Sequence, residues 1–261
     1  MPFCRECGFE VQAGWKFCPE CTAPLEPSNQ SSQTVTVQTG SWVEGDIINN
    51  DIETIMQGMK QVLSELGFTK DSSPAELTTE QTAQVEQVLE VSEQLAGHGI
   101  EIDPWAEITL GNAAKLAGRT HSSQQHYLRA LDTFRKNGDR QGESYSLGNL
   151  GTIAKTRGDL AEAERLQRES LTISREIGDR QGESYSLNNL GLIAKTRGDL
   201  AEAERLYRES LTISREIGDR QSESDSLNSL GNIAQTRGDL AEAERLQRES
   251  LAIKREIGDR Q

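Results

Sequence analysis

The stretch GDRQGESYSLNNLGLIAKTRGDLAEAERLYRESLTISREI, residues 178–217, is one of a series of near-copies along the chain. The 40 residues before it differ from it at three positions, and the 40 residues after it differ at eight. Residues 98–137 keep the same glycine spacing with more divergent side chains. Self-similarity at a fixed period of this size is the signature of a repeat array. The sequence therefore predicts stacked copies of one unit, at about 98–137, 138–177, 178–217 and 218–257.

Each unit carries two stretches with the apolar spacing of an amphipathic helix. In the second unit, Leu147, Leu150 and Ile153 share one face of the first stretch. Gly158 then interrupts the pattern, and Asp159 with Glu162 three residues later is typical of a capped helix start. We therefore expect every unit to fold as two antiparallel helices joined by a short turn.

The unit SLNNLGLIAKTRGDLAEAERLYRESLTI resembles the tetratricopeptide repeat, most closely the longer variety found in kinesin light chains. The small residues Gly191, Ala203 and Ser210, with Tyr207, match the packing pattern of that family, whereas Gln167 and Gln247 replace its aromatic residue. The resemblance covers about residues 98–261. It implies an all-α, right-handed superhelical array of antiparallel helix pairs, a solenoid whose first helices line a concave groove. Most members of the family bind extended peptide segments in that groove.

The near-identical units differ mainly on one face of their first helix, within an arc of about 140° at 100° per residue. Free drift of an exposed face would also explain this variation. The face nevertheless carries groups suited to peptide binding, because an Asn amide can pair with both a peptide N–H and a C=O. By the resemblance, this is the face that lines the groove. The candidate groove residues are Tyr145, Asn149, Lys155, Tyr185, Asn188, Asn189, Lys195 and Asn228.

All four cysteines of the chain lie in its first 21 residues, as the pairs Cys4 with Cys7 and Cys18 with Cys21. Two CxxC turns brought together supply the four thiolates that a tetrahedral zinc ion accepts. Two disulfides, or an iron or redox site, are the alternative readings of the same four residues. The stretch FCRECGFEVQAGWKFCPECTAPL, residues 3–25, resembles short zinc ribbons. We therefore expect residues 1–26 to form a zinc ribbon with a structural or protein-docking role.

Between the ribbon and the repeats the sequence predicts two further parts. Residues 27–50 begin as a polar linker, and the alternating, β-branched residues of 34–37 indicate a short β-hairpin. Residues 51–97 carry helical periodicity, first to about Gly67 and again from about Thr79 to Ala96. We expect this part to form a helical N-terminal region that packs on the repeats.

Charge and motifs narrow the class of function. The formal net charge is −14, the wrong sign for a protein that grips nucleic acid by bulk charge, and residues 71–114 hold no Lys or Arg. No apolar run reaches the length of a membrane span, and the start of the chain lacks a secretion signal, which favours a cytoplasmic protein. Motifs of hydrolases and phosphate-binding enzymes are absent from the sequence. The sequence therefore favours a non-enzymatic scaffold or adaptor that binds a protein or peptide.

Two other functions fit the sequence less well. One is a transcription-linked regulator that contacts nucleic acid through the zinc ribbon. The other is a homo-oligomeric structural subunit, because each unit of an array covers its predecessor and terminal units normally need a polar cap. Self-association through the last unit is expected on that reading, with an apolar face formed by Leu230, Ile233, Leu240, Leu246, Leu251 and Ile253.

Overall fold

A computed structural model describes residues 52–69 and 74–258 of the chain. The chain divides into two units, residues 1–41 and 42–261, and all described residues belong to the second. The expected zinc ribbon and the expected hairpin of residues 27–50 therefore lie outside the described residues. Within these ranges no helix combines the length and the apolar character needed to cross a membrane.

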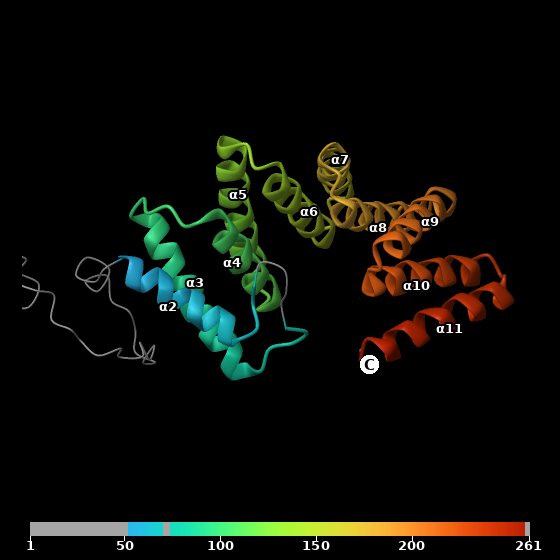
Figure 1. The fold of residues 1–261 in the computed structure, drawn as a ribbon, viewed down its shortest axis with the longest axis horizontal. Coiled ribbons are helices and arrows are strands. Elements are labelled where there is room, and N and C mark those ends of the chain that lie inside the picture. Colours follow the sequence, from blue (N-terminus) through green and yellow to red (C-terminus); the bar gives the residue numbers. More distant parts are fainter. Residues whose placement is uncertain (1–51, 70–73, 259–261) are drawn as a thin grey trace, which may run out of the picture. The chain divides into compact units, whose positions relative to one another are not determined.

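The described ranges contain α-helices and no strand (Figure 1). The helices, labelled as in Figure 1, are α2 (Ile52–Glu65), α3 (Thr79–Gly97), α4 (Pro104–Leu116), α5 (Thr120–Asn137), α6 (Arg140–Thr156), α7 (Leu160–Ile177), α8 (Arg180–Thr196), α9 (Leu200–Ile217), α10 (Arg220–Thr236) and α11 (Leu240–Glu256). The two helices expected between residues 51 and 97 are present as α2 and α3.

The helices pack as consecutive antiparallel pairs, which confirms the expected all-α solenoid. The tightest packing joins α4 with α5, α6 with α7, α8 with α9, and α10 with α11, one pair for each repeat. We call α4, α6, α8 and α10 the first helices and their partners the second helices. The second helix of each pair also packs against the first helix of the next pair, so the array is continuous.

The helix boundaries coincide with Asp and Gly residues that recur from one repeat to the next. Asp159 caps α7 by accepting a hydrogen bond from the backbone N–H of Glu162 at 3.0 Å. Gly178 ends the same helix with a φ of 70°, a left-handed conformation that glycine adopts without steric cost. The same Asp and Gly recur at the ends of the later helices, so the period of 40 residues is fixed by these boundaries.

The core of each pair comes from the apolar residues that the periodicity predicts. In the second repeat Leu147, Leu150 and Ile153 are buried on α6, and Ala163 and Ile173 are buried on α7. Small residues bring the paired helices together, as at Gly191, where a Cβ atom would lie 2.8 Å from the Tyr207 ring. The packing of Gly191 against Tyr207 that the family resemblance implies is therefore present.

Ion pairs fasten each repeat to the next. Glu143, near the start of α6, is 8% exposed and accepts hydrogen bonds from Arg135 at 2.9 Å and Arg140 at 2.6 Å. The two arginines also reach Glu169 and Glu176 on α7, so three successive helices are linked. The same arrangement surrounds Glu183 and Glu223. A buried carboxylate held by two guanidinium groups fixes the spacing of neighbouring pairs.

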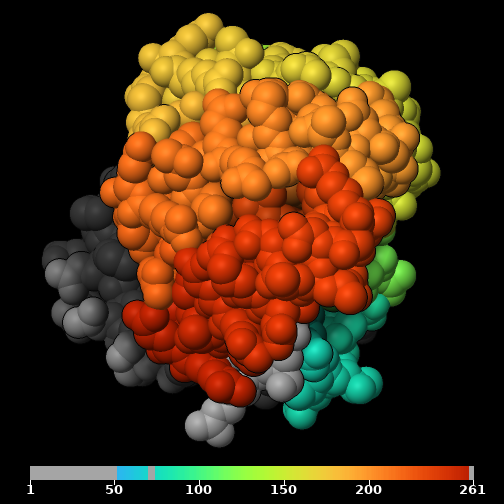
Figure 2. Space-filling model, turned by 90° about the vertical axis from the view of Figure 1, so that its right-hand side faces the viewer, coloured from blue at the N-terminus to red at the C-terminus, as the bar shows by residue number. Residues whose placement is uncertain are grey.

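The apolar side chains of the last repeat are mostly covered. Leu230, Ile233, Leu246 and Ile253 are buried within their own pair, whereas Leu240 is 67% and Leu251 47% exposed. Figure 2 shows this end of the repeat array, with the red surface of α11 toward the viewer. Self-association through the last repeat stays a prediction. Of the six apolar residues expected on its face, only Leu240 and Leu251 are exposed.

Candidate functional site

Successive first helices contact one another, α4 with α6, α6 with α8 and α8 with α10, more extensively than successive second helices do. The side on which neighbouring helices lie closer is the inner side of a curved array. We define the inner face as five positions of each first helix, which span an arc of about 120° at 100° per residue. In α4 they are Trp105, Ile108, Thr109, Asn112 and Lys115, and they recur 40 residues apart.

A row of aromatic rings follows the start of the first helices. The row begins at Trp105, whose ring centroid lies 6.1 Å from that of Tyr145 in an edge-on arrangement. Tyr185 packs its ring over Gly148, and its hydroxyl lies 3.3 Å from the hydroxyl of Thr152. Tyr145 and Tyr185 remain 38% and 43% exposed. The fourth repeat departs from the row because Asp225 stands at this position.

The asparagines of the inner face differ in accessibility. Asn149 is 5% exposed, donates from Nδ2 to the Tyr145 carbonyl at 3.1 Å, and accepts from the Lys115 ammonium at 3.3 Å. Asn189 is half-buried and donates to the Tyr185 carbonyl at 3.1 Å, which leaves its Oδ1 as an acceptor. Asn188 is half-buried and Asn228 is exposed. The structure thus offers Asn188, Asn189 and Asn228 to a partner more readily than Asn149.

A row of lysines follows the ends of the first helices. Lys115, Lys155 and Lys195 occupy the same position in three successive repeats, and the fourth repeat has Gln235 there. Burial of the ammonium group lowers the pKa of Lys155 from its usual value. The same effect lowers the pKa of Lys115, although the side chain of Lys115 is exposed overall. Within residues 52–69 and 74–258, no carboxylate pairs with any of these three lysines. The inner face is therefore basic although the chain is strongly acidic.

Buried serines hold the helices behind this face. The Ser144 hydroxyl on α6 lies 3.0 Å from that of Ser170 and 2.8 Å from that of Ser174, both on α7. Ser170 continues the chain to Ser186 on α8 at 3.1 Å. These hydrogen bonds join two successive pairs through their cores, so the inner face rests on a fixed support.

Several residues of the inner face were not among the candidate groove residues, and the most prominent are Trp105 and Lys115. A signal for both was present, because they lie one period of 40 residues before Tyr145 and Lys155, but the divergence of the first repeat concealed it. The four cysteines lie outside the described residues. Among the residues that the structure describes, no cluster of His, Cys, Asp and Glu has the arrangement of a metal site.

The fold and this face define a helical repeat protein with an aromatic and lysine-lined inner surface. A family model of the tetratricopeptide repeat matches residues 103–176 and 182–256, more than half of the chain, so the chain belongs to the tetratricopeptide repeat family. A zinc-ribbon domain model matches residues 3–25. A search of curated proteins found no significant match.

Solved structures of low sequence identity share the fold. BtubC from P. vanneervenii is 17% identical with a TM-score of 0.54, and the match covers 81% of this chain and 94% of that one. A Podospora anserina protein described as a kinesin light chain with nearly identical repeats is 15% identical with a TM-score of 0.53, covering 85% of this chain and all of that one. A Rap conjugation gene regulator of the plasmid pLS20, solved in complex with the Phr* peptide, is 16% identical with a TM-score of 0.60. The match covers 89% of this chain and 60% of that one.

Proposed function

We propose that the chain is a non-catalytic scaffold that binds an extended, acidic segment of a partner protein along the inner face. The observation that carries the proposal is the row of Lys115, Lys155 and Lys195, which have no carboxylate partner within residues 52–69 and 74–258 and lie beside a row of exposed rings. A partner carboxylate would compensate the desolvation of the Lys115 and Lys155 ammonium groups. The Rap regulator with the Phr* peptide supports the proposal, because a similar fold there accompanies a bound peptide.

The rings, amides and lysines of the inner face would each contact a different part of the bound segment. Exposed Tyr145 and Tyr185 offer ring surface to apolar side chains, and they lose little entropy because their rings are already packed on one side. The amides of Asn188, Asn189 and Asn228 would pair with the peptide backbone, which holds an extended segment without dictating its sequence. The lysines would then select acidic segments among those that fit.

A selection experiment tests this function. The full-length chain is used to enrich peptides from a displayed random library of 12-residue sequences, and the enriched peptides are synthesised and titrated. We expect acidic peptides, and we expect Asn189→Ala with Asn228→Ala to weaken binding by about 1–3 kcal/mol, because peptide groups lose their hydrogen-bond partners. The matched control is Thr172→Ala with Thr212→Ala, at exposed positions of second helices.

Two results would contradict the proposed function. Affinity that is the same in both double variants would exclude the inner-face asparagines. Enrichment of basic peptides would point instead to the acidic segment of residues 71–114 as the docking surface.

We propose that Cys4, Cys7, Cys18 and Cys21 hold one zinc ion. The zinc-ribbon match supports this, and the donor set fits, because four thiolates in two CxxC pairs suit a closed structural site. Elemental analysis of protein purified without added metal should find about one zinc per chain. Cys18→Ser should lower that content without changing the helicity of the repeats, because repeat stability depends on neighbouring units. Two intact disulfides in metal-free protein would exclude the zinc site.

A further inference from the structure

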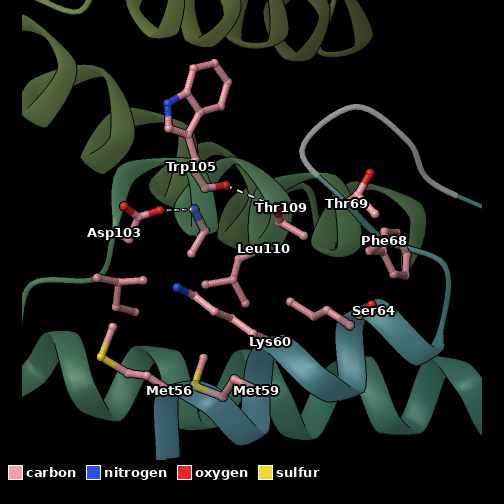
Figure 3. A pocket seen from close by; sticks show the side chains of 13 residues that line it. Met56, Met59, Lys60, Ser64, Phe68, Thr69, Asp103, Trp105, Thr109 and Leu110 are labelled. Carbon is pink, nitrogen blue, oxygen red and sulfur yellow. Dashed lines mark hydrogen bonds between the residues drawn. The ribbon is translucent and has the colours of Figure 1, made fainter. Parts of the chain in front are cut away.

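An apolar cavity of about 260 Å³ lies between α2 and α4, at the N-terminal end of the inner face (Figure 3). Flexible methionines and other apolar side chains form most of its wall, and methionine adapts readily to varied guests. Its lining residues include Met56, Met59, Leu63, Phe68, Ala106 and Leu110. The volume is slightly below the range of about 300–1,000 Å³ typical of sites for drug-sized ligands. It therefore suits one large side chain better than a cofactor.

The cavity adjoins the inner face through two shared residues, Trp105 and Thr109. Taking Trp105 as 0° and 100° per residue, the inner face of α4 runs from about −80° to 40°. The cavity-lining residues of the same helix continue from there to Leu110, at about 140°. A segment lying along the inner face would consequently meet the opening of the cavity as it crosses α4.

Among the described residues, the space between α2 and α4 lacks an aromatic ring of the kind that lies between α4 and α6 and between α6 and α8. Between α6 and α8, the Tyr185 ring covers Gly148. Between α4 and α6, Tyr145 meets Trp105 edge-on. The Trp105 indole also packs on Phe134 at 4.9 Å, and Figure 3 shows it pointing away from Met56 and Met59. The space between α2 and α4 thus stays open.

The charges at the cavity agree with those of the inner face. Lys60 lines the cavity, and among the described residues no carboxylate pairs with it. Asp103 lines it as well, but its carboxylate caps α4 by accepting from the Ala106 N–H at 3.0 Å. The cavity therefore combines an apolar interior with an available ammonium group, which is the complement of an apolar side chain next to a carboxylate.

We infer that this cavity receives one large apolar side chain, of the size of Leu, Met or Phe, from the acidic segment on the inner face, with an adjacent carboxylate facing Lys60. The inference rests on the proposed function and adds a specificity site to it. The cavity side chain would fix the register of the segment, which the sequence-tolerant asparagines leave open.

A cycle of changes in the chain and in the peptide tests this site. The probe is the tightest acidic 12-residue peptide enriched by the full-length chain, together with its version in which the single large apolar residue is alanine. We expect the alanine peptide to bind the unchanged chain about tenfold to a hundredfold more weakly, the effect of removing a large apolar side chain from an apolar cavity. In Ala106→Leu, which fills the cavity from α4, the two peptides should differ less than about twofold.

Ala161→Leu on α7 is the matched control, since Ala161 is exposed and far from the lining residues, and there the full difference should remain. If Ala106→Leu does not fold, Met56→Phe fills the cavity from α2 instead. An undiminished difference between the peptides in the filled cavity would overturn this site while leaving the proposed function intact. Enriched peptides without an apolar preference would do the same, whereas failure to enrich any acidic peptide would overturn the proposed function itself.

Discussion

Gln167 shows how a single residue departs from the packing of its family. It is fully buried on α7, and its Nε2 donates to the Gly148 carbonyl at 2.7 Å, but its Oε1 has no hydrogen-bond partner. The first and third repeats have Tyr127 and Tyr207 at this position, both almost fully buried. A buried acceptor without a partner costs stability, so Gln167 in place of the aromatic residue leaves an unsatisfied polar atom in the core.

We predict that Gln167→Tyr raises the free energy of unfolding by about 1–2 kcal/mol, because it removes the unsatisfied oxygen and buries a ring. Gln247→Tyr is the matched control. Gln247 is exposed at the same repeat position, so its replacement should change stability by less than about 0.5 kcal/mol. Urea titrations of both variants check this, and equal effects would contradict the assignment of the cost to Gln167 Oε1.

A buried polar cluster distinguishes the first repeat. Glu107 accepts hydrogen bonds from Arg129 at 2.8 Å and lies 2.6 Å from His126 Nδ1, and both Glu107 and His126 are almost fully buried. The second repeat has Leu147 and Leu166 at the positions of Glu107 and His126. The cluster therefore replaces an apolar contact that the same fold accepts.

We predict that Glu107→Leu with His126→Leu leaves the chain as stable as before or more stable, because burying charged groups carries a desolvation cost. Glu107→Leu alone should lower stability by about 3–5 kcal/mol, since His126 and Arg129 then lose their carboxylate partner. Thermal unfolding distinguishes the two. A double variant that is no better than the single one would show that the cluster itself stabilises the repeat.

At the scale of the helix, the same glycine position has two different surroundings. A Cβ atom at Gly142 would lie 2.3 Å from the buried Phe134 ring, whereas at Gly182 it would meet the Asp179 carboxylate and the Ser174 hydroxyl. Ser222 occupies this position in the fourth repeat and donates its hydroxyl to Asp219 at 2.7 Å. The packing of the preceding helix thus decides whether the position needs glycine.

We predict that Gly142→Ser destabilises the chain by about 1–3 kcal/mol, the usual cost of overpacking a core, because α6 must move away from Phe134. Gly182→Ser should be neutral or slightly stabilising, since serine is favoured over glycine within a helix. Denaturant titration of this pair is the check. Equal losses would mean that the start of the helix, rather than the Phe134 contact, requires glycine.

The elements were predictable from sequence because local rules fix them. These local rules are the Asp caps, the left-handed glycines and the apolar periodicity. Each acts within one helix, and each recurs in several repeats of the sequence. The inner face was less predictable, since it depends on contacts between repeats. Asn149 looks like Asn189 in sequence, yet Lys115 from the preceding repeat covers it. The cavity at α2 was beyond prediction, because it arises from the packing of two unlike helices.

At the scale of the whole molecule, ion pairs between repeats make stability depend on pH. Hydrogen bonds from Arg168 lower the pKa of Glu164, and desolvation partly offsets this effect. Arg197 from the next repeat lowers the pKa of Glu164 further. Arg208 and Arg237 do the same for Glu204. A carboxyl group whose folded pKa lies below its unfolded value of about 4.3 stabilises the fold above that value. This contribution is lost as the pH falls through the folded pKa.

We predict that Glu164→Gln with Glu204→Gln lowers the melting temperature at pH 7 and reduces its fall between about pH 5 and pH 3. The matched control is Glu244→Gln, at the same repeat position but paired with Arg248 alone within its own helix. Melting curves across this range check the prediction. A pH dependence equal to that of the unchanged chain would show that the pairs between repeats contribute nothing.

In the proposed function, the inner face binds acidic peptide through its lysine row. The most direct test is the affinity of one enriched acidic peptide for two double variants that lose the same charge. Lys155→Ala with Lys195→Ala removes lysines of the inner face, whereas Lys136→Ala with Lys254→Ala removes lysines of second helices, where Lys136 pairs with Asp132 at 2.6 Å. We predict that the inner-face variant binds the peptide about tenfold more weakly and with a shallower salt dependence, while the other variant binds within twofold of the unchanged chain. Equal affinity of the two variants for the peptide would show that the lysine row does not bind it.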